Sequence, residues 1–381
     1  MAVAALAATF PLTGFASEKT EAIVKGVDGM EIPIVIYTPE TGAGPFPVVF
    51  HVHGGGWNGG TETEVPGAGV GSASILCDRL GIICVGLAYR CKNQNGTFQL
   101  AMDDLQDSVA WFWERGEEFN ADLSRIGFSG GSAGTPLSAL MAQQVPKCKT
   151  YLGCWGVYDL MDNKESLFPD EESRALYGLA SEQQALEASA FHNLRSPPPA
   201  TLLLHGGKDI LTHASQSLKF GKQIEAKGGQ AEVIIFPDMN HNFLGLSNPA
   251  AYKKGILAIS HFYQEQFDLA FNDFALLEKE LDERVDGYWP ASSIEDEQLL
   301  GWWKGKKETL SLLKGGQAEI INLRGKTSPA TYQIEGATFE ITSDGASRTF
   351  YLRRDGRAIY EILQDERRGG VKMIYNKKRK K

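Results

Sequence analysis

The chain reads IGFSGGSAG over residues 126–134. A short apolar run, typical of a buried strand, leads into the pattern G-x-S-x-G, and a helix-like segment follows. This order predicts a sharp strand-to-helix turn with Ser132 at its apex, where small neighbours avoid clashes and the hydroxyl is presented as a nucleophile. The first turn of the following helix would direct its amides toward negative charge. A tight structural turn is the alternative interpretation.

Strand-like and helix-like segments alternate around this turn from about Glu31 to Gln266. Apolar strands that alternate with helices predict a mostly parallel sheet covered on both faces. Residues 160–196 are acidic, helical in character and too long for an ordinary connection, so we expect them to form a small cap. The expected strands are residues 31–37, 46–52, 82–87, 126–129, 151–155, 201–204 and 233–236, and the expected helices are 103–114, 133–144, 215–227 and 251–267.

The pattern changes beyond about Glu278. Glycine-containing turn signals recur roughly every ten residues between short alternating runs, which predicts an antiparallel β-meander. Trp289, Trp302 and Trp303 precede these runs and are candidates for its core. From Gly301 onward the chain has 10 Lys and 8 Arg against 9 acidic residues, although the whole chain has a net charge of −9. This shift indicates two domains, an α/β domain over residues 20–275 and a small all-β accessory domain over residues 285–381.

The N-terminal segment, residues 1–16, is an apolar run that ends in small residues, as in a secretory signal peptide, although no basic residue precedes Lys19. We expect a periplasmic or secreted protein, or a cytoplasmic one if this segment is not a signal. No other segment is apolar enough for stable membrane insertion. The five cysteines show no metal-ligand spacing.

A glycine run, His53-Gly54-Gly55-Gly56-Trp57, ends the expected strand 46–52. Three successive glycines let backbone amides approach a ligand without obstruction by side chains. We therefore expect the amides of Gly54, Gly55, Gly56 and Ala133 to form an oxyanion hole. A flexible glycine loop is the alternative.

Two further residues follow expected strands. Asp209 comes after the strand 201–204, and His241 comes after the last strand, 233–236. The chain order Ser132, Asp209, His241 is the one that a parallel sheet of this kind requires for a nucleophile, an acid and a base. A helix cap is the alternative role for the aspartate. Four other histidines lie close to these motifs and compete for the role of base: His51, His53, His205 and His213.

These motifs together resemble the α/β-hydrolase fold, and within it the hormone-sensitive-lipase-like and small acetyl-esterase group. The resemblance covers about residues 31–267 and rests on residues 53–57, 88–90, 104, 110–111, 125–132, 198–209 and 236–243. Asn242 departs from the family pattern, which usually has glycine there. The long N-terminal cap of the family's lipase members is absent, and the C-terminal meander lies outside the resemblance.

The predicted function is a serine carboxylesterase that acts on short, acetyl-type esters. His241 would take the proton of Ser132, Asp209 would orient His241, and no metal or cofactor would be needed. The expected partner is a small ester or an acylated carbohydrate, with no nucleic acid, and the C-terminal domain is either structural or a polysaccharide contact. An amidase, formamidase or peptidase with the same triad remains open, as does a binding module with a vestigial triad.

Overall fold

The computed structural model describes residues 17–60, 72–162, 174–175, 177–245, 248–288, 294–305, 307–336, 338–352, 354, 358–362 and 371–377. The chain divides into two compact units, residues 1–274 and 275–381. The predicted signal segment, residues 1–16, lies outside the described residues.

The first unit is built on an eight-stranded sheet with the order β1-β2-β4-β3-β5-β6-β7-β8. The strands from β4 to β8 in this order run parallel, and β1 and β2 add an antiparallel hairpin at one edge. The strands are β1 Ser17–Lys25, β2 Glu31–Pro39, β3 Phe46–Val52, β4 Ile83–Leu87, β5 Ala121–Gly131, β6 Cys148–Cys154, β7 Ala200–Gly206 and β8 Ala231–Phe236.

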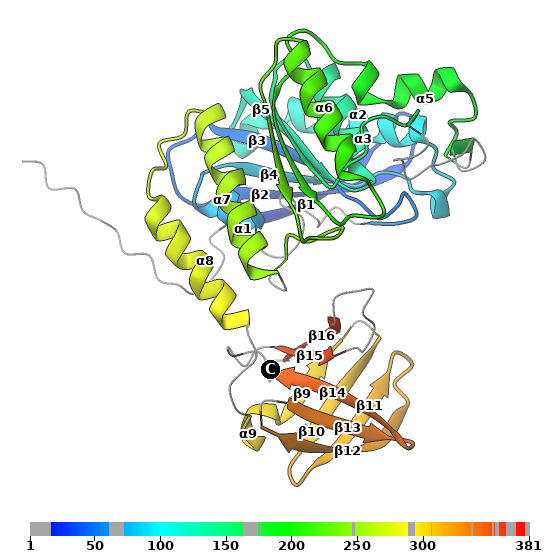
Figure 1. Cartoon of the computed structure of the whole chain (residues 1–381), viewed down its shortest axis with the longest axis vertical. Helices are drawn as coiled ribbons and strands as arrows, with labels where there is room; N and C mark the ends of the chain where they lie inside the picture. The colour runs from blue at the N-terminus through cyan, green and yellow to red at the C-terminus, as the bar shows by residue number, and fades with distance from the viewer. Residues whose placement is uncertain are drawn as a thin grey trace, which may run out of the picture. The chain divides into compact units, whose positions relative to one another are not determined.

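Helices cover both faces of this sheet. Helices α1 and α7 lie on one face, and α2, α3 and α6 lie on the other (Figure 1). Every residue of β3 and β4 is buried, as expected of strands covered on both sides. The helices are α1 Ser72–Asp78, α2 Phe98–Glu114, α3 Gly134–Gln144, α5 Glu182–Ala188, α6 Ala214–Ala226 and α7 Pro249–Gln266, with 3₁₀ turns at Lys92–Gln94, Gly116–Phe119 and Ala190–His192.

The predicted α/β-hydrolase fold is confirmed, since each of the seven expected strands falls on one of the strands β2 to β8. The cap expected over residues 160–196 remains a prediction, because residues 163–173 and 176 lie outside the described part of the chain. In its described part, α5 begins after Ser181, whose side chain accepts a hydrogen bond from the Gln184 amide.

All five cysteines lie in the first unit, and each is a buried free thiol. Burial raises the pKa of each of these thiols above its usual range: Cys77, Cys84, Cys91, Cys148 and Cys154. The fold therefore holds them as apolar packing groups rather than as reactive thiolates. Within the described residues, no helix is both long and apolar enough to cross a membrane.

The second unit is a closed antiparallel barrel with the strand order β10-β11-β12-β13-β14-β15-β16-β9. Two helices precede it in the chain, α8 Phe274–Tyr288 and α9 Asp296–Leu299. The strands are β9 Gly301–Lys304, β10 Glu308–Leu313, β11 Gln317–Asn322, β12 Thr327–Glu335, β13 Thr338–Ser343, β14 Ala346–Leu352, β15 Ala358–Ile362 and β16 Val371–Lys377.

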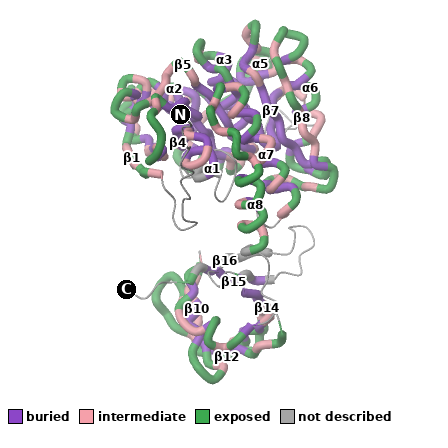
Figure 2. The backbone as a smooth tube through the Cα atoms, turned by 90° about the vertical axis from the view of Figure 1, so that its left-hand side faces the viewer, coloured by how far each residue is buried: buried purple, intermediate pink, exposed green. Residues whose placement is uncertain are grey.

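The predicted meander is confirmed, and β9 closes it by pairing with both β10 and β16. Buried residues line the barrel interior (Figure 2). Trp303 on β9 is fully buried among them, whereas Trp302 points outward and is half exposed. The expectation that tryptophans plug the core is therefore right for Trp303 and wrong for Trp302, and Trp289 lies outside the described residues.

Candidate active site

Ser132 sits between the end of β5 and the start of α3. Its φ of 52° lies in the left-handed region, which is uncommon for a residue other than glycine and costs about 1 kcal/mol or more. Hydrogen bonds hold the turn: the Ser132 amide donates to the Cys154 carbonyl at 3.0 Å, and the Ser132 carbonyl accepts from the Thr135 amide at 3.0 Å. The surrounding structure thus enforces the strained turn that the sequence predicts.

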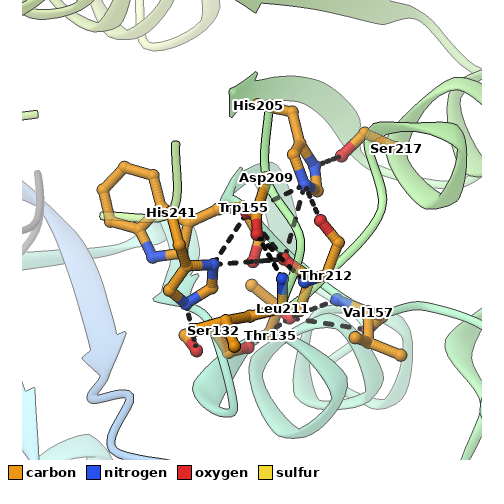
Figure 3. Close-up of polar contacts among 10 residues, drawn as sticks. All are labelled: Ser132, Thr135, Trp155, Val157, His205, Asp209, Leu211, Thr212, Ser217 and His241. Atoms are coloured by element: carbon orange, nitrogen blue, oxygen red, sulfur yellow. Dashed lines mark hydrogen bonds and ion pairs between the residues drawn. The ribbon is translucent and has the colours of Figure 1, made fainter. Parts of the chain in front are cut away.

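His241 lies in the loop after β8 and faces Ser132 (Figure 3). Its Nε2 is 2.8 Å from Ser132 Oγ, and its Nδ1 is 2.7 Å from Asp209 Oδ2. A carboxylate only accepts hydrogen bonds, so Nδ1 carries the proton and Nε2 is left to accept from the serine hydroxyl. Asn242, where the family usually has glycine, has φ 55°, a conformation that asparagine tolerates better than most residues.

The loop that carries His241 packs against the end of β7. A Cβ atom at Gly206 would lie 2.4 Å from the carbonyl oxygens of both Met239 and Asn240, so only glycine permits this approach. The Lys208 amide donates to the Met239 carbonyl at 2.9 Å. The segment that bears Asp209 and the loop that bears His241 are therefore held together by the backbone.

Asp209 is a buried carboxylate with a hydrogen-bond donor on every side. Its Oδ1 accepts from the amides of Leu211 at 2.9 Å and Thr212 at 3.0 Å, and its Oδ2 accepts from His241 and from the Thr212 hydroxyl at 2.9 Å. Burial alone would raise the pKa of Asp209, but its interactions with His205 and His241 and the Thr212 amide hold that pKa well below its usual range. Asp209 is thus ionised at neutral pH.

The glycine run approaches Ser132 from the end of β3. A Cβ atom at Gly54 would lie 3.2 Å from Ser132 Cβ, and one at Gly55, whose φ is 110°, would lie 1.6 Å from the Gly59 carbonyl oxygen. Trp57 Nε1 donates to the carbonyl of Ala133, the residue after the serine. Gly56 accepts a hydrogen bond from the Tyr177 hydroxyl at 3.0 Å. The structure therefore brings Gly54 beside Ser132 and ties the end of the glycine run to Ala133 through Trp57, whereas Gly55 and Gly56 contact Gly59 and Tyr177.

Three of the four competing histidines, His51, His53 and His205, bond to groups other than Ser132. His51 Nδ1 lies 3.0 Å from Ser129 Oγ. The pKa of His51 is lowered to about 3, mainly by burial and to a smaller extent by the neighbouring His53. His53 donates to the Gly54 carbonyl at 2.7 Å and stacks on Tyr89 with ring centroids 4.3 Å apart. His205 is fully buried behind Asp209, and His213 is exposed at the start of α6.

The sequence motifs include Trp57 without giving it a role, and they assign no site role to Thr212 or Trp155. The Thr212 hydroxyl donates a hydrogen bond to Asp209, and Trp57 joins the two predicted oxyanion segments. The Trp155 ring lies edge-on to the His241 ring, with ring centroids 6.2 Å apart. Only Thr212 has a local signal in the sequence, because an aspartate commonly accepts hydrogen bonds from amides two or three residues ahead. In the described part of the chain, no group of three His, Cys, Asp or Glu side chains is placed to hold a metal ion.

The sheet order and the position of Ser132, Asp209 and His241 after three of its strands define an α/β-hydrolase fold. The chain belongs to the BD-FAE family, whose model matches residues 34–224. This match ends before His241 and excludes the barrel.

Curated relatives match parts of the chain. Carboxylesterase NlhH of Mycobacterium tuberculosis is 36% identical over 123 residues, which cover 31% of this chain and 36% of that protein. Arylacetamide deacetylase of Oryctolagus cuniculus is 31% identical over 123 residues, covering 30% of this chain and 29% of that protein. The chain thus spans less than two thirds of the length of these relatives.

Solved structures share the fold. The native form of esterase Est2 from Thermogutta terrifontis superposes with a TM-score of 0.57 at 20% identity, covering 68% of this chain and 95% of that chain. The propionate-bound form of the same esterase gives a TM-score of 0.56 at 21% identity, covering 67% of this chain and 96% of that chain.

Proposed function

We propose that this protein is a serine carboxylesterase with Ser132 as its nucleophile. The observation that carries the proposal is the continuous hydrogen-bonded line from Ser132 Oγ through His241 to the buried, ionised Asp209. His241 accepts the serine proton through Nε2 as the oxygen attacks an ester carbonyl. Asp209 holds the Nδ1–H tautomer and stabilises the imidazolium that forms. The imidazolium then protonates the leaving alcohol, and water hydrolyses the acyl-enzyme by the same route.

The oxyanion of each tetrahedral intermediate is bound by backbone amides from the glycine run and from Ala133. Support comes from the close approach of Gly54 to Ser132 and from Trp57, which ties the glycine run to Ala133. Each such donor is worth about 3–4 kcal/mol in the barrier at comparable sites. The amides are fixed before substrate arrives, so they need no reorganisation during the reaction.

The decisive test compares Ser132→Ala with Ser124→Ala, a change on the same strand but outside the site. We expect Ser132→Ala to lower kcat for p-nitrophenyl acetate by about 10⁶-fold and to abolish labelling by a fluorophosphonate probe. Ser124→Ala should retain both. Undiminished turnover by Ser132→Ala would refute the nucleophile assignment, and failure of the wild type to label would favour a binding module with a vestigial triad.

The proposed substrates carry short acyl groups, in the first place acetyl. Only 45 residues separate the end of β6 from the start of β7, and in their described part the longest helix is the seven-residue α5. This short connection supports a small cap and hence a short acyl group. We expect kcat/KM to fall as the acyl chain of p-nitrophenyl esters lengthens. A preference for long chains would contradict this, and faster turnover of matched amides would indicate an amidase or peptidase.

An acylated carbohydrate is the natural substrate that we propose, with the barrel as a polysaccharide contact. The half-exposed Trp302 on the outer surface of β9 supports this, since an exposed aromatic ring offers a face on which a sugar can stack. Trp302→Ala should weaken retention on acetylated polysaccharide without changing kcat for p-nitrophenyl acetate. Equal retention would leave the barrel with a structural role.

We also propose export to the periplasm or the medium with removal of residues 1–16. The apolar run over residues 1–16, which ends in small residues, supports this proposal. Expression of the full chain followed by N-terminal sequencing should give Ser17 as the first residue of the exported protein. Retention of Met1 in a cytoplasmic product would contradict export.

A further inference from the structure

A second histidine stands behind Asp209 and joins three elements of the fold. His205 on β7 is fully buried, with Nε2 2.9 Å from the Thr212 carbonyl oxygen and Nδ1 2.7 Å from Ser217 Oγ on α6 (Figure 3). Thr212 and Ser217 are fully buried as well. His205 therefore links the strand before Asp209, the turn after it and the helix that follows.

The acceptors fix the direction of these hydrogen bonds. A carbonyl oxygen only accepts hydrogen bonds, so His205 Nε2 carries a proton and donates a hydrogen bond to the Thr212 carbonyl. The same nitrogen lies 3.4 Å from Asp209 Oδ2. In the neutral ring, Nδ1 then accepts from the Ser217 hydroxyl, which holds the ring in one orientation.

Thr212 is the residue through which this link reaches the site. Its amide donates to Asp209 Oδ1 at 3.0 Å, and its hydroxyl lies 2.9 Å from Asp209 Oδ2 and 3.3 Å from His241 Nδ1. A shift of the Thr212 backbone would therefore displace the carboxylate that orients His241. The contact from His205 is made to that backbone, on its carbonyl.

We propose that His205 is a positioning residue of the hydrolytic site, which holds the turn from Asp209 to Thr212 by donating from Nε2 to the Thr212 carbonyl. The proposal rests on the proposed function, because it assigns His205 to the same reaction. His205 does not touch Ser132, and because it is fully buried it does not touch the substrate either. Its loss should therefore lower kcat and leave KM unchanged.

Two substitutions separate this role from simple packing. In His205→Gln the side-chain amide places a donor where Nε2 lies, whereas in His205→Asn the shorter amide reaches only the Nδ1 side, toward Ser217. We expect His205→Asn to lower kcat for p-nitrophenyl acetate about 10- to 100-fold at unchanged KM, as misplacement of a catalytic group by up to about 1 Å can do. We expect His205→Gln to stay within about threefold of wild type, as loss of one neutral hydrogen bond allows.

Turnover is expressed per active site titrated with a fluorophosphonate, so an unfolded fraction does not enter kcat. The rate at which the probe labels Ser132 is measured in parallel and should follow the same order without any ester substrate. Equal kcat for the two variants, or a rise in KM that accounts for the loss, would overturn the positioning role. If His205→Asn does not fold, Ser217→Ala replaces it, with a several-fold lower kcat expected and an unchanged kcat overturning the proposal.

The two proposals fail in different ways. A wild-type chain that labels with the probe but hydrolyses no ester counts against the esterase, and the labelling rates of the variants still test His205. An active wild type with a fully active His205→Asn counts against the role of His205 alone.

Discussion

Both units bury charged side chains, but their hydrogen-bond networks end differently. In the first unit the line from Asp209 through His241 stops at Ser132 Oγ, and the His241 side chain is 16% exposed. In the barrel, Arg348 donates to both carboxylate oxygens of Glu361 at 2.9 and 2.8 Å and to Glu308 at 2.6 Å, and the Tyr375 hydroxyl also donates to Glu308 at 2.8 Å.

The barrel network closes on itself across β10, β14, β15 and β16. Each ion there faces a fixed partner, so the network can only hold strands together. The line in the α/β unit ends on a hydroxyl next to solvent, so it can pass a proton to something that is not part of the protein. The open end suits the first network to the proposed catalysis, whereas the closed network suits the second to a structural role.

The largest effect is expected when the hydrogen-bonded line from Asp209 to Ser132 is broken at Asp209. In Asp209→Asn the amides of Leu211 and Thr212 require an oxygen at Oδ1, so the side-chain NH₂ must face His241 Nδ1. This forces the proton onto Nε2, which can no longer accept from Ser132. We expect kcat to fall about 10⁴-fold with little change in KM, measured by steady-state ester hydrolysis. A loss below tenfold would show that Asp209 does not set the tautomer.

The second prediction breaks the closed network. Arg348→Met leaves Glu308 and Glu361 without their cation, which should destabilise the barrel by about 3 kcal/mol. Lys304→Met, which removes an exposed charge from β9, should change stability by less than about 0.5 kcal/mol. Calorimetric unfolding of the full chain should show a lower transition temperature for Arg348→Met alone, with kcat unchanged. An unshifted transition would mean that the network contributes nothing to the barrel.

The third prediction concerns a buried group outside both networks. Because burial and then His53 lower the pKa of His51 to about 3, the unfolded chain takes up this proton first as the pH falls below about 6.5. The contribution of neutral His51 to the free energy of unfolding is therefore complete above pH 6.5. It is lost between pH 6.5 and about 3, at up to about 1.4 kcal/mol per pH unit. His51→Asn keeps a polar atom toward Ser129 and should flatten the slope by that amount in urea unfolding from pH 6.5 to 4.5. An unchanged slope would contradict the assignment of this pH dependence to His51.

The smallest expected effect lies at the other side of Ser132. Trp57→Phe removes the Nε1 donor to Ala133 and keeps a ring against Phe98 and Tyr177. We expect kcat to fall about 3- to 10-fold, since one hydrogen bond of about 1 kcal/mol holds the end of the glycine run to Ala133. Trp302→Phe on the barrel is the matched control and should leave kcat unchanged. Equal activity of both variants would exclude a role for Trp57 in placing the amides.

The parts of the fold with strong local patterns could be predicted from the sequence. The fully apolar strands β3 and β4, and the order in which Ser132, Asp209 and His241 follow strands, carry their own signals. Strand β1 was missed because its sequence SEKTEAIVK is mostly polar and packs as an edge strand. Strand β9 is four residues long, and only its pairing with β10 and β16 identifies it.

The supporting residues of the site could not be predicted in the same way. Thr212, His205 and Ser217 are ordinary residues in the sequence, and their roles arise from the turn that brings β7 and α6 together. Strand β10 has a weak local signal, since Leu310 and Leu312 alternate with polar residues but Leu313 breaks the alternation. Tertiary packing therefore decides the roles of the supporting residues, and pairing with β9 and β11 identifies β10.

The buried thiols give this chain a built-in reporter of local opening. All five cysteines lie between Cys77 and Cys154, and the sequence from residue 275 onward contains none. A thiol reagent added in a short pulse would therefore modify the protein only while the α/β unit is open, whatever the state of the barrel. The number of labels gained under denaturant or heat, counted by mass spectrometry, would follow the unfolding of one unit inside the intact chain without an introduced probe.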